Sequence, residues 1–394
     1  MADEIQEVEA ALVAGDRQRA LELAAIGFQT AGDAHRLFEI RKMQARLRLG
    51  LPLVSWAERR KGEGSSSSDE VRPEVQKQLE DQLLAACREA AEMLLANGII
   101  AAAWPYLEPL DDRDWVRQQI ERAPVDASNL EAMTEYAFHR GGHPAYGYRL
   151  ILKNSGTCNA ITLFDSAAPY LDRATRIKLA QELVEHFFAE LVNNVGASMR
   201  DRQPDNPLSQ TFGADEFIKA TGESKLELSG GPHIDATHLN SVTRIGQIVS
   251  EASLIEKLLA LSQYGSRLPE MFHFPGIAPF ENQFADCVVF FQALAGREID
   301  SAIEHFRLKL DQADGTPNHL LVVETVVDWL GRIGRAKEAV DIAIAYPLDD
   351  FGQLGIAPNL LEIAKQNPEA ERRLAQHFRE RGDLLSFLMT SVSN

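Results

Sequence analysis

Apolar residues recur with helical spacing along most of the chain, interrupted by glycines. In the first fifty residues, apolar positions three or four apart lie on both sides of Gly15 and Asp16, which predicts paired helices. These positions are Val8, Leu12, Ala20, Leu21, Leu23, Ala24, Leu37, Ile40, Met43 and Leu47. The same spacing returns after residue 71 and again after Phe284. We therefore expect helices in both terminal parts of the chain.

A glycine followed five residues later by a small residue marks the predicted turns between these helices. The pairs are Gly15–Ala20, Gly50–Ser55, Gly98–Ala103, Gly142–Gly147, Gly296–Ser301 and Gly334–Ala339. A glycine can end a helix in a left-handed cap, and a small residue in the next helix lets two helices cross closely. Successive glycines lie 35 to 48 residues apart, with one gap of 154. Periods of this size are typical of stacked helix pairs.

Two segments resemble the helix-turn-helix of tetratricopeptide repeats. They are Trp329 to Val340, with the sequence WLGRIGRAKEAV, and Leu12 to Leu21. The resemblance covers about a third of the chain and lacks the aromatic and proline positions of full repeats, so it indicates a degenerate relative. It implies a helical array that binds a protein or peptide partner on a concave surface.

We expect an all-α fold of stacked antiparallel helix pairs, forming either an α-solenoid or a closed α/α array. Helical-repeat regions are predicted at 1–149, with a flexible Ser- and Gly-rich loop at 62–69, and at 286–394. Between them, residues 150–285 form a central region with an irregular insertion.

In the central region we expect one helix near 174–193 and another near 241–263. An irregular segment at 198–232, with a possible strand at 225–228, separates them, and a second irregular stretch follows at 269–282. A loop this long is uncommon in a compact domain unless it covers a site or binds something.

Charge and composition argue against several classes of binding partner. The chain has 394 residues, 58 acidic and 40 basic, and a net charge of −18 without a block of Lys or Arg. This balance argues against a nucleic-acid or anionic membrane partner. The acidic start lacks the pattern of a signal peptide, and no apolar stretch approaches 18 residues, so we expect a cytoplasmic protein. The oligomeric state is left open.

The three cysteines, Cys87, Cys158 and Cys287, lie far apart, which suits reduced thiols. Cys87 and Cys287 sit in apolar helical stretches and are expected in the core, whereas Cys158 follows Gly156 in a turn-like setting and is a candidate nucleophile. No phosphate loop, dinucleotide fingerprint or nucleophile elbow is present in the sequence.

Seven of the ten histidines fall between His139 and His305. His233, Asp235 and His238 lie within six residues, directly before a predicted helix. His233 with Asp235, or Asp235 with His238, could give two ligands to zinc, iron or manganese. A third ligand would come from elsewhere, with His143 and His186 as the first candidates. The competing interpretation makes Asp235 the N-cap of the following helix. The two interpretations exclude each other, because a capping carboxylate points at backbone amides.

Other side chains are candidates for lining a pocket. His139, Tyr146, Tyr148 and Arg149 surround the Gly-Gly-His-Pro turn at 141–144. Cys158 and His273 are further candidates, although His273, between Phe272 and Phe274, also fits a core position. The favoured function is a helical-repeat interaction protein, and the alternative is a metal-dependent enzyme with a mononuclear His/Asp site in the central region; whether the protein is an enzyme is left open.

Overall fold

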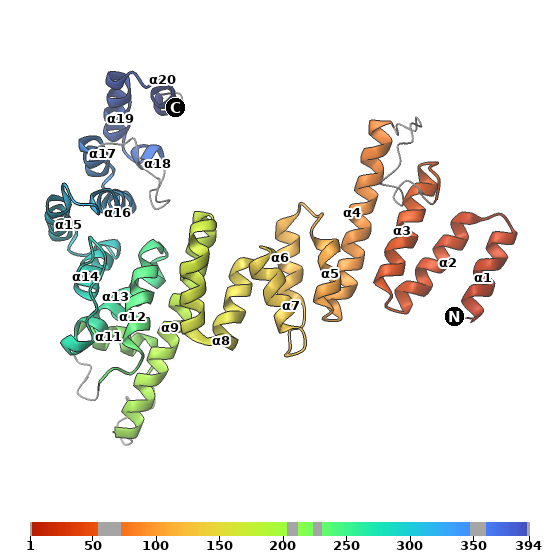
Figure 1. The fold of residues 1–394 in the computed structure, drawn as a ribbon, viewed down its shortest axis with the longest axis horizontal. Coiled ribbons are helices and arrows are strands. Elements are labelled where there is room, and N and C mark those ends of the chain that lie inside the picture. The colour runs from red at the N-terminus through yellow and green to blue at the C-terminus, as the bar shows by residue number, and fades with distance from the viewer. Residues whose placement is uncertain (1, 54–71, 203–211, 224–230, 347–359, 392–394) are drawn as a thin grey trace. The chain divides into compact units, whose positions relative to one another are not determined.

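The computed structural model describes residues 2–53, 72–202, 212–223, 231–346 and 360–391. Within these residues the regular secondary structure is helical, and β-type pairing is limited to one isolated bridge between Pro275 and Asn282. Helices that follow one another along the chain pack side by side as antiparallel pairs (Figure 1). The fold is all-α, as the helical spacing predicts. The predicted loop at 62–69 and the possible strand at 225–228 lie outside the described residues.

The chain divides into two compact units, Met1–Leu150 and Ile151–Asn394. The helices of the first unit are α1 (Ala2–Val13), α2 (Arg17–Thr30), α3 (Ala34–Arg48), α4 (Pro73–Ala96), α5 (Ile100–Leu107), α6 (Arg113–Arg122), α7 (Leu130–Thr134), η2 (Glu135–His139) and the start of α8 (Pro144–Ala167). The predicted division into three regions stays a prediction.

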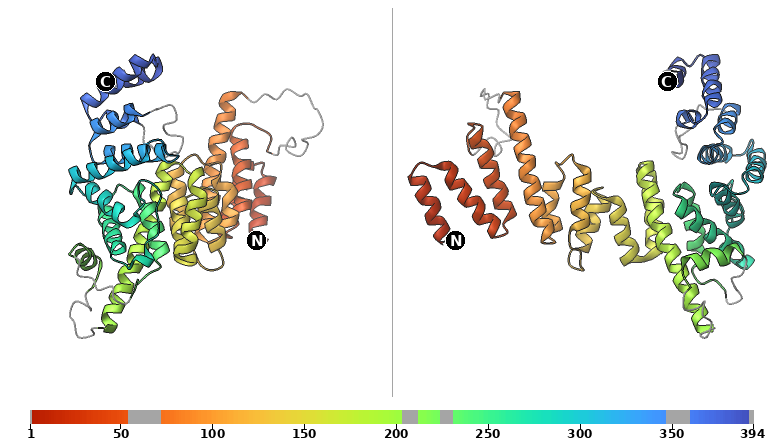
Figure 2. Two further views of the ribbon diagram at one scale, coloured as in Figure 1. Left: turned by 60° about the vertical axis from the view of Figure 1, so that its left-hand side comes forward. Right: turned by 180° about the vertical axis from the view of Figure 1, so that it is seen from behind.

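The second unit contains the rest of α8 and the helices that follow it. They are η3 (Ala168–Tyr170), α9 (Arg173–Arg202), α11 (Ala214–Gly222), α12 (Ala236–Ile245), η4 (Gly246–Ile248), α13 (Ala252–Ser266), η5 (Glu270–Phe272), α14 (Gln283–Leu294), α15 (Ile299–Ala313), α16 (His319–Arg332), α17 (Ala336–Ala345), α18 (Leu360–Ala364), α19 (Pro368–Arg381) and α20 (Leu384–Ser391). Figure 2 shows α12 and α13 packed beside α9.

Most of the glycines in the predicted turns adopt the left-handed conformation. The φ angles lie between 67° and 77° at Gly15, Gly50, Gly98, Gly296 and Gly334. Gly142 is the exception, because the left-handed residue is its neighbour Gly141, with φ of 74°. Gly142 instead lies against the Tyr136 ring, where an added Cβ would come within 2.7 Å of a ring carbon. Its small size is required by packing rather than by backbone conformation.

The small residues that follow these glycines lie at helix contacts, except after Gly296, where the buried small residue comes one position later than predicted. Ala20, Ala103 and Ala339 are buried, and Gly147 packs against the backbone of Phe138. Ser301 is exposed, and the buried residue is Ala302. The shift follows from Glu298, which is also left-handed with φ of 51°, so that α15 begins one residue later after its glycine. Ser55 lies outside the described residues.

Helix α8 is interrupted at Gly156, whose φ of 81° and ψ of 173° are not helical. A side chain at this position would be strained, since this part of conformational space is essentially restricted to glycine. The next residue, Thr157, is buried and donates a hydrogen bond from Oγ1 to Glu190 of α9 at 3.1 Å. This bond ties the segment after the interruption to α9.

The central region contains more helix than its composition predicts. Helix α9 continues to Arg202, and α11 lies inside the segment predicted to be irregular. The single helix predicted at 241–263 is two helices, because α12 ends at Ile245 and α13 begins at Ala252. Gly246 lies between them against Leu258, where an added Cβ would come within 2.2 Å of a methyl carbon. The stretch 269–282 is irregular apart from η5, as predicted.

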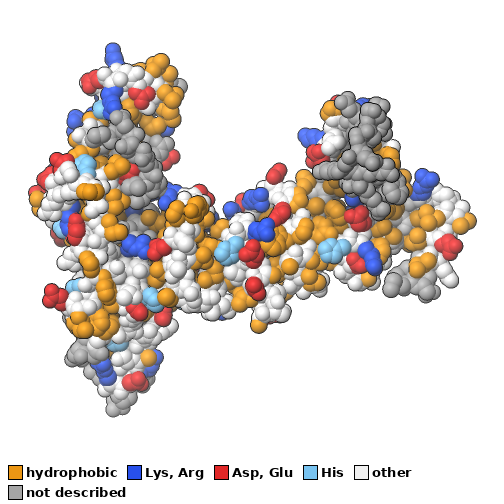
Figure 3. Space-filling view, in the orientation of Figure 1, with side chains coloured by type: hydrophobic (Ala, Val, Ile, Leu, Met, Phe, Trp, Pro, Cys, Tyr) orange, Lys and Arg blue, Asp and Glu red, His pale blue; other side chains and the backbone are white. Residues whose placement is uncertain are grey.

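The surface carries apolar side chains on the last described helix. Leu384 and Leu385 of α20 are 68% and 70% exposed, and Figure 3 shows apolar atoms gathered over this helix. Among the described helices, none combines the length and the apolar composition needed to cross a bilayer.

Candidate functional site

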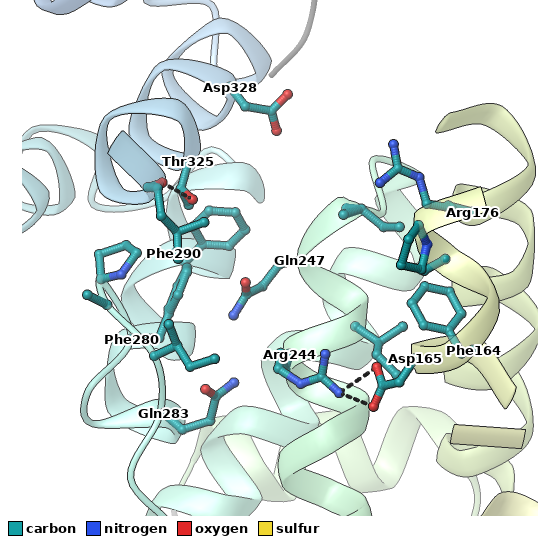
Figure 4. A pocket seen from close by; sticks show the side chains of 18 residues that line it. Phe164, Asp165, Arg176, Arg244, Gln247, Phe280, Gln283, Phe290, Thr325 and Asp328 are labelled. Carbon is teal, nitrogen blue, oxygen red and sulfur yellow. Dashed lines mark hydrogen bonds and ion pairs between the residues drawn. The ribbon is translucent and has the colours of Figure 1, made fainter. Parts of the chain in front are cut away.

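A cavity of about 440 Å³ lies within the second unit (Figure 4). Segments far apart in the sequence form its wall: the end of α8 with η3, the first turn of α9, α12 with η4, the irregular stretch 277–280, α14 and α16. Its size is typical of cavities that bind small molecules.

Aromatic side chains form the apolar wall of the cavity. Phe280, from the irregular stretch, lies edge-on to Phe290 of α14 with ring centroids 5.4 Å apart. Phe290 in turn stacks on Trp329 of α16 at 6.0 Å. Phe164 of α8 contributes from a separate part of the wall. Because Phe280, Phe290 and Trp329 are buried and Phe290 contacts both of the other rings, this wall is held in place before any ligand binds.

Two carboxamides point into the cavity in Figure 4, Gln247 from η4 and Gln283 from α14. Both donate to the same sulfur atom, since Nε2 of Gln247 lies 3.6 Å and Nε2 of Gln283 lies 3.4 Å from Cys287 Sγ. Gln283 also donates to Thr243 Oγ1 at 3.4 Å. Burial raises the pKa of the Cys287 thiol to about 12, so the sulfur remains protonated at neutral pH.

Ion pairs neutralise the carboxylates of the cavity wall. Arg244 of α12 donates from Nη2 to both oxygens of Asp165, at 2.9 and 2.8 Å. Asp328 of α16 is buried and accepts from Arg173 Nη2 at 2.6 Å and from Arg332 Nη1 at 3.4 Å. Arg176 of α9 also lines the cavity. The wall therefore combines apolar surface with acidic groups that already have basic partners.

Arg332 also fixes the turn that carries Gln247. Its Nη1 donates to the backbone carbonyl of Gln247 at 2.5 Å, and its Nη2 donates to the carbonyl of Val249. Burial lowers the pKa of the Arg332 guanidinium, and the nearby Asp328 carboxylate acts in the opposite direction. Because the bonds go to main-chain atoms, Arg332 joins α16 to the end of η4 and leaves the Gln247 side chain facing the cavity.

The structure assigns Asp235 to the N-cap of α12. Its Oδ1 accepts from the backbone N of Thr237 at 2.7 Å and from the Thr237 hydroxyl at 2.6 Å, and lies 3.4 Å from the backbone N of His238. The bonds from Thr237 hold the pKa of the Asp235 carboxyl below its usual range. The carboxylate is directed at helix amides, which is the arrangement that competes with a ligand role.

His233 is held by Tyr264 of α13. The Tyr264 hydroxyl accepts from the His233 backbone N at 2.8 Å and lies 3.0 Å from its Nδ1. Burial, with a smaller effect of Arg202, lowers the pKa of His233 and favours the neutral ring. A neutral Nδ1 without a proton can accept the tyrosine hydrogen. His233 thereby fastens the turn before α12 to the core.

The other predicted ligands do not join these residues. His143 Nε2 lies 3.0 Å from Glu121 of α6 in the first unit, and His186 is half-buried on α9 in the second. Within the described parts of the chain, no three His, Cys, Asp or Glu side chains are placed to hold a metal ion. The predicted set of His233, Asp235, His238, His143 and His186 is therefore not brought together there.

The side chains predicted to line a pocket lie in different environments. His139 and Arg149 are exposed, Tyr146 is half-buried, and Tyr148 is fully buried beside Phe138. Cys158 is exposed, whereas Cys87 and Cys287 are buried, as expected. His273 donates from Nε2 to the Gly265 carbonyl at 3.1 Å and packs edge-on to Phe284, which fits the core position. None of the six lines the cavity described above.

Most cavity residues were missed because they belong to ordinary helices in the sequence. The available signal was the irregular stretch at 269–282, which supplies Ile277 to Phe280 to the wall. Its prolines and aromatic residues, placed between two helices, mark a segment that is ordered by packing.

Comparisons with known proteins identify no family. No family model matches the chain, and no curated protein matches it either. A solved structure described as a circular tandem repeat protein with novel repeat topology and enhanced subunit contact surfaces is similar at 15% identity. The match covers 99% of this chain and 86% of that chain, with a TM-score of 0.15.

Proposed function

We propose that this chain is a helical-repeat interaction protein, and that the cavity of the second unit binds an apolar segment of a protein or peptide partner. The observation that carries the proposal is the 440 Å³ cavity with its aromatic wall of Phe280 and Phe290. Cavities of this kind bury apolar groups from water, and a few polar groups in them orient the ligand. The carboxylates of Asp165 and Asp328 already have arginine partners. These two carboxylates therefore do not require a positively charged ligand, and a neutral apolar segment fits the cavity.

We also infer that the helix pairs are degenerate relatives of tetratricopeptide repeats. The α16–α17 pair supports this inference. Trp329 of α16 is buried, and Gly334 forms the left-handed turn that precedes α17 with its buried Ala339. Arrays of this type commonly present binding surfaces to peptides.

The proposal is tested by selecting short random peptides, displayed on phage, against the full chain and measuring their affinities by fluorescence polarisation. Thr325 lines the cavity, and its hydroxyl donates to the Leu321 carbonyl. A Thr325→Trp substitution would fill the cavity and should weaken the selected peptides about tenfold or more, a loss of about 1.4 kcal/mol in binding free energy.

The matched control is Thr162→Trp. Thr162 also donates its hydroxyl to a carbonyl one turn back, that of Cys158, but it is exposed and does not line the cavity. Ala168→Trp fills the cavity from η3 and covers the case in which Thr325→Trp misfolds. Selected peptides that bind both filled variants as tightly as the unmodified chain would show that they bind elsewhere and would overturn the proposal.

A further inference from the structure

The carboxamides of Gln247 and Gln283 have weak partners for their position in the cavity. Gln283 is only 3% exposed, yet its Nε2 donates to the Thr243 hydroxyl and to the Cys287 thiol, each at a distance of 3.4 Å. Gln247 Nε2 donates to the same thiol at a distance of 3.6 Å. A cysteine sulfur is a weak acceptor, and the 3.4 Å bond to the Thr243 hydroxyl is long for an N–H···O bond.

The oxygen atoms of the two carboxamides differ in their surroundings, because Gln283 Oε1 lies against Gly276 and Gln247 is half-buried. Within the described residues, neither Gln247 Oε1 nor Gln283 Oε1 accepts a hydrogen bond. A buried polar group without a good partner costs free energy, and a ligand that supplies the partner recovers it. The cavity thus presents the Gln247 carboxamide, together with the weakly bound carboxamide of Gln283, beside an aromatic wall.

We propose that Gln247 and Gln283 recognise the main-chain amide groups of the bound segment, so that the partner is an extended, uncharged peptide with a large apolar side chain against Phe280 and Phe290. This inference rests on the proposed function. A carboxamide matches a peptide group, because each has one N–H side and one C=O side. Main-chain recognition in extended peptides combined with a pocket for a side chain is a common mode of peptide binding.

The charges of the wall favour an uncharged ligand over an anion. Asp165 pairs with Arg244, and Asp328 pairs with Arg173 and Arg332, so three of the arginines around the cavity already bind carboxylates. An anion would compete with these pairs for the same guanidinium groups, and Arg176 is the one further arginine among the described residues that line the cavity. An amide ligand leaves them intact and uses the groups whose partners are weak.

The test uses three small probes with the same phenylalanine side chain, added to the full chain and followed by ligand-observed NMR. N-acetyl-phenylalanine N-methylamide offers two amide groups, the matching methyl ester lacks one N–H, and N-acetyl-phenylalanine is an anion at neutral pH. The N-methylamide should bind about fivefold to tenfold more tightly than the ester, as expected for the loss of one hydrogen bond in a buried site.

The variants Gln247→Met and Gln283→Met keep the volume of the side chain but remove its amide. Each should reduce the preference for the N-methylamide over the ester while leaving ester binding nearly unchanged. Gln376→Met, on the exposed face of α19, is the control and should leave the preference intact. Gln247 is only half-buried, so its variant tests the inference even where Gln283→Met fails to fold.

The outcomes separate this inference from the proposed function. If both Met variants prefer the N-methylamide over the ester as strongly as the unmodified chain does, the proposed role of the carboxamides is overturned. Tighter binding of the anionic probe, or no binding of any probe, would overturn it as well. In each of these cases, peptides that are selected from the library and blocked by Thr325→Trp would leave the proposed function standing.

Discussion

Arg173 Nη2 donates to Asp328 Oδ1 at 2.6 Å, which joins the start of α9 to α16 across 155 positions of the chain. Asp328 is 7% exposed and also faces Arg332, which is bound to two backbone carbonyls. The carboxylate therefore neutralises charge at the point where three segments of the second unit meet.

We predict that Asp328→Asn destabilises the protein by about 2 to 4 kcal/mol, near the lower end of the range for breaking a buried ion pair because Arg173 is partly exposed. The matched control, Asp165→Asn, removes a pair on the exposed rim with Arg244 and should cost about 0 to 1 kcal/mol. Urea denaturation followed by circular dichroism measures both. Equal losses in the two variants would contradict the importance of the buried position.

Gly156→Ala should destabilise the protein by about 1 to 3 kcal/mol, because the φ of 81° and ψ of 173° at this position strain any residue with a Cβ. Gly222→Ala is the control, since Gly222 is helical and has nothing within 4 Å of an added Cβ. There, alanine should be neutral or stabilising by about 0.5 to 1 kcal/mol. Melting curves compare the two, and an unchanged melting temperature for Gly156→Ala would show that the backbone relaxes at that site.

His233 should make stability depend on pH. Its folded pKa lies below the unfolded value of about 6.5, so the unfolded chain takes up the proton first as the pH falls. The stabilisation from neutral His233 is thus fully present above pH 6.5 and is lost as the pH falls from there through the folded pKa. We predict that the stability difference between the unmodified chain and His233→Gln shrinks between pH 8 and pH 5. A difference that is constant over this interval would contradict it.

The three thiols should react with iodoacetamide in a fixed order. Cys158 is exposed, whereas Cys87 and Cys287 are buried with pKa values raised by burial, to about 12 for Cys287. Because the thiolate is the reactive form, Cys158 should be labelled in the native protein and the other two only after denaturation. Mass spectrometry of the tryptic peptides reports the order. Rapid native labelling of Cys287 would show that the wall of the cavity opens readily.

The sequence predicted the features that are decided locally. The left-handed turns at Gly15 and Gly334 follow from glycine between two helical patterns, and the cap at Asp235 was one of two stated alternatives. Ser301 was misplaced by one residue because the second left-handed residue, Glu298, has no side-chain signature.

The cavity could not be predicted in the same way. Its wall combines Phe164, Gln247, Phe280 and Asp328, which only the packing of the second unit brings together. The histidine-rich composition of the centre was a misleading guide, because His233 and His273 satisfy hydrogen bonds of the core. The break between α12 and α13 depends on the approach of Leu258 to Gly246, a contact that helical spacing does not encode.

Arg332 donates hydrogen bonds to the backbone carbonyls of residues 247 and 249 and not to their side chains. Any amino acid except one that disturbs the backbone can therefore occupy position 247 without loosening that attachment. The support of the wall and its chemical preference are thus separable properties. A laboratory could exchange Gln247 for acidic, basic or aromatic residues and redirect the cavity to new ligands on an unaltered framework.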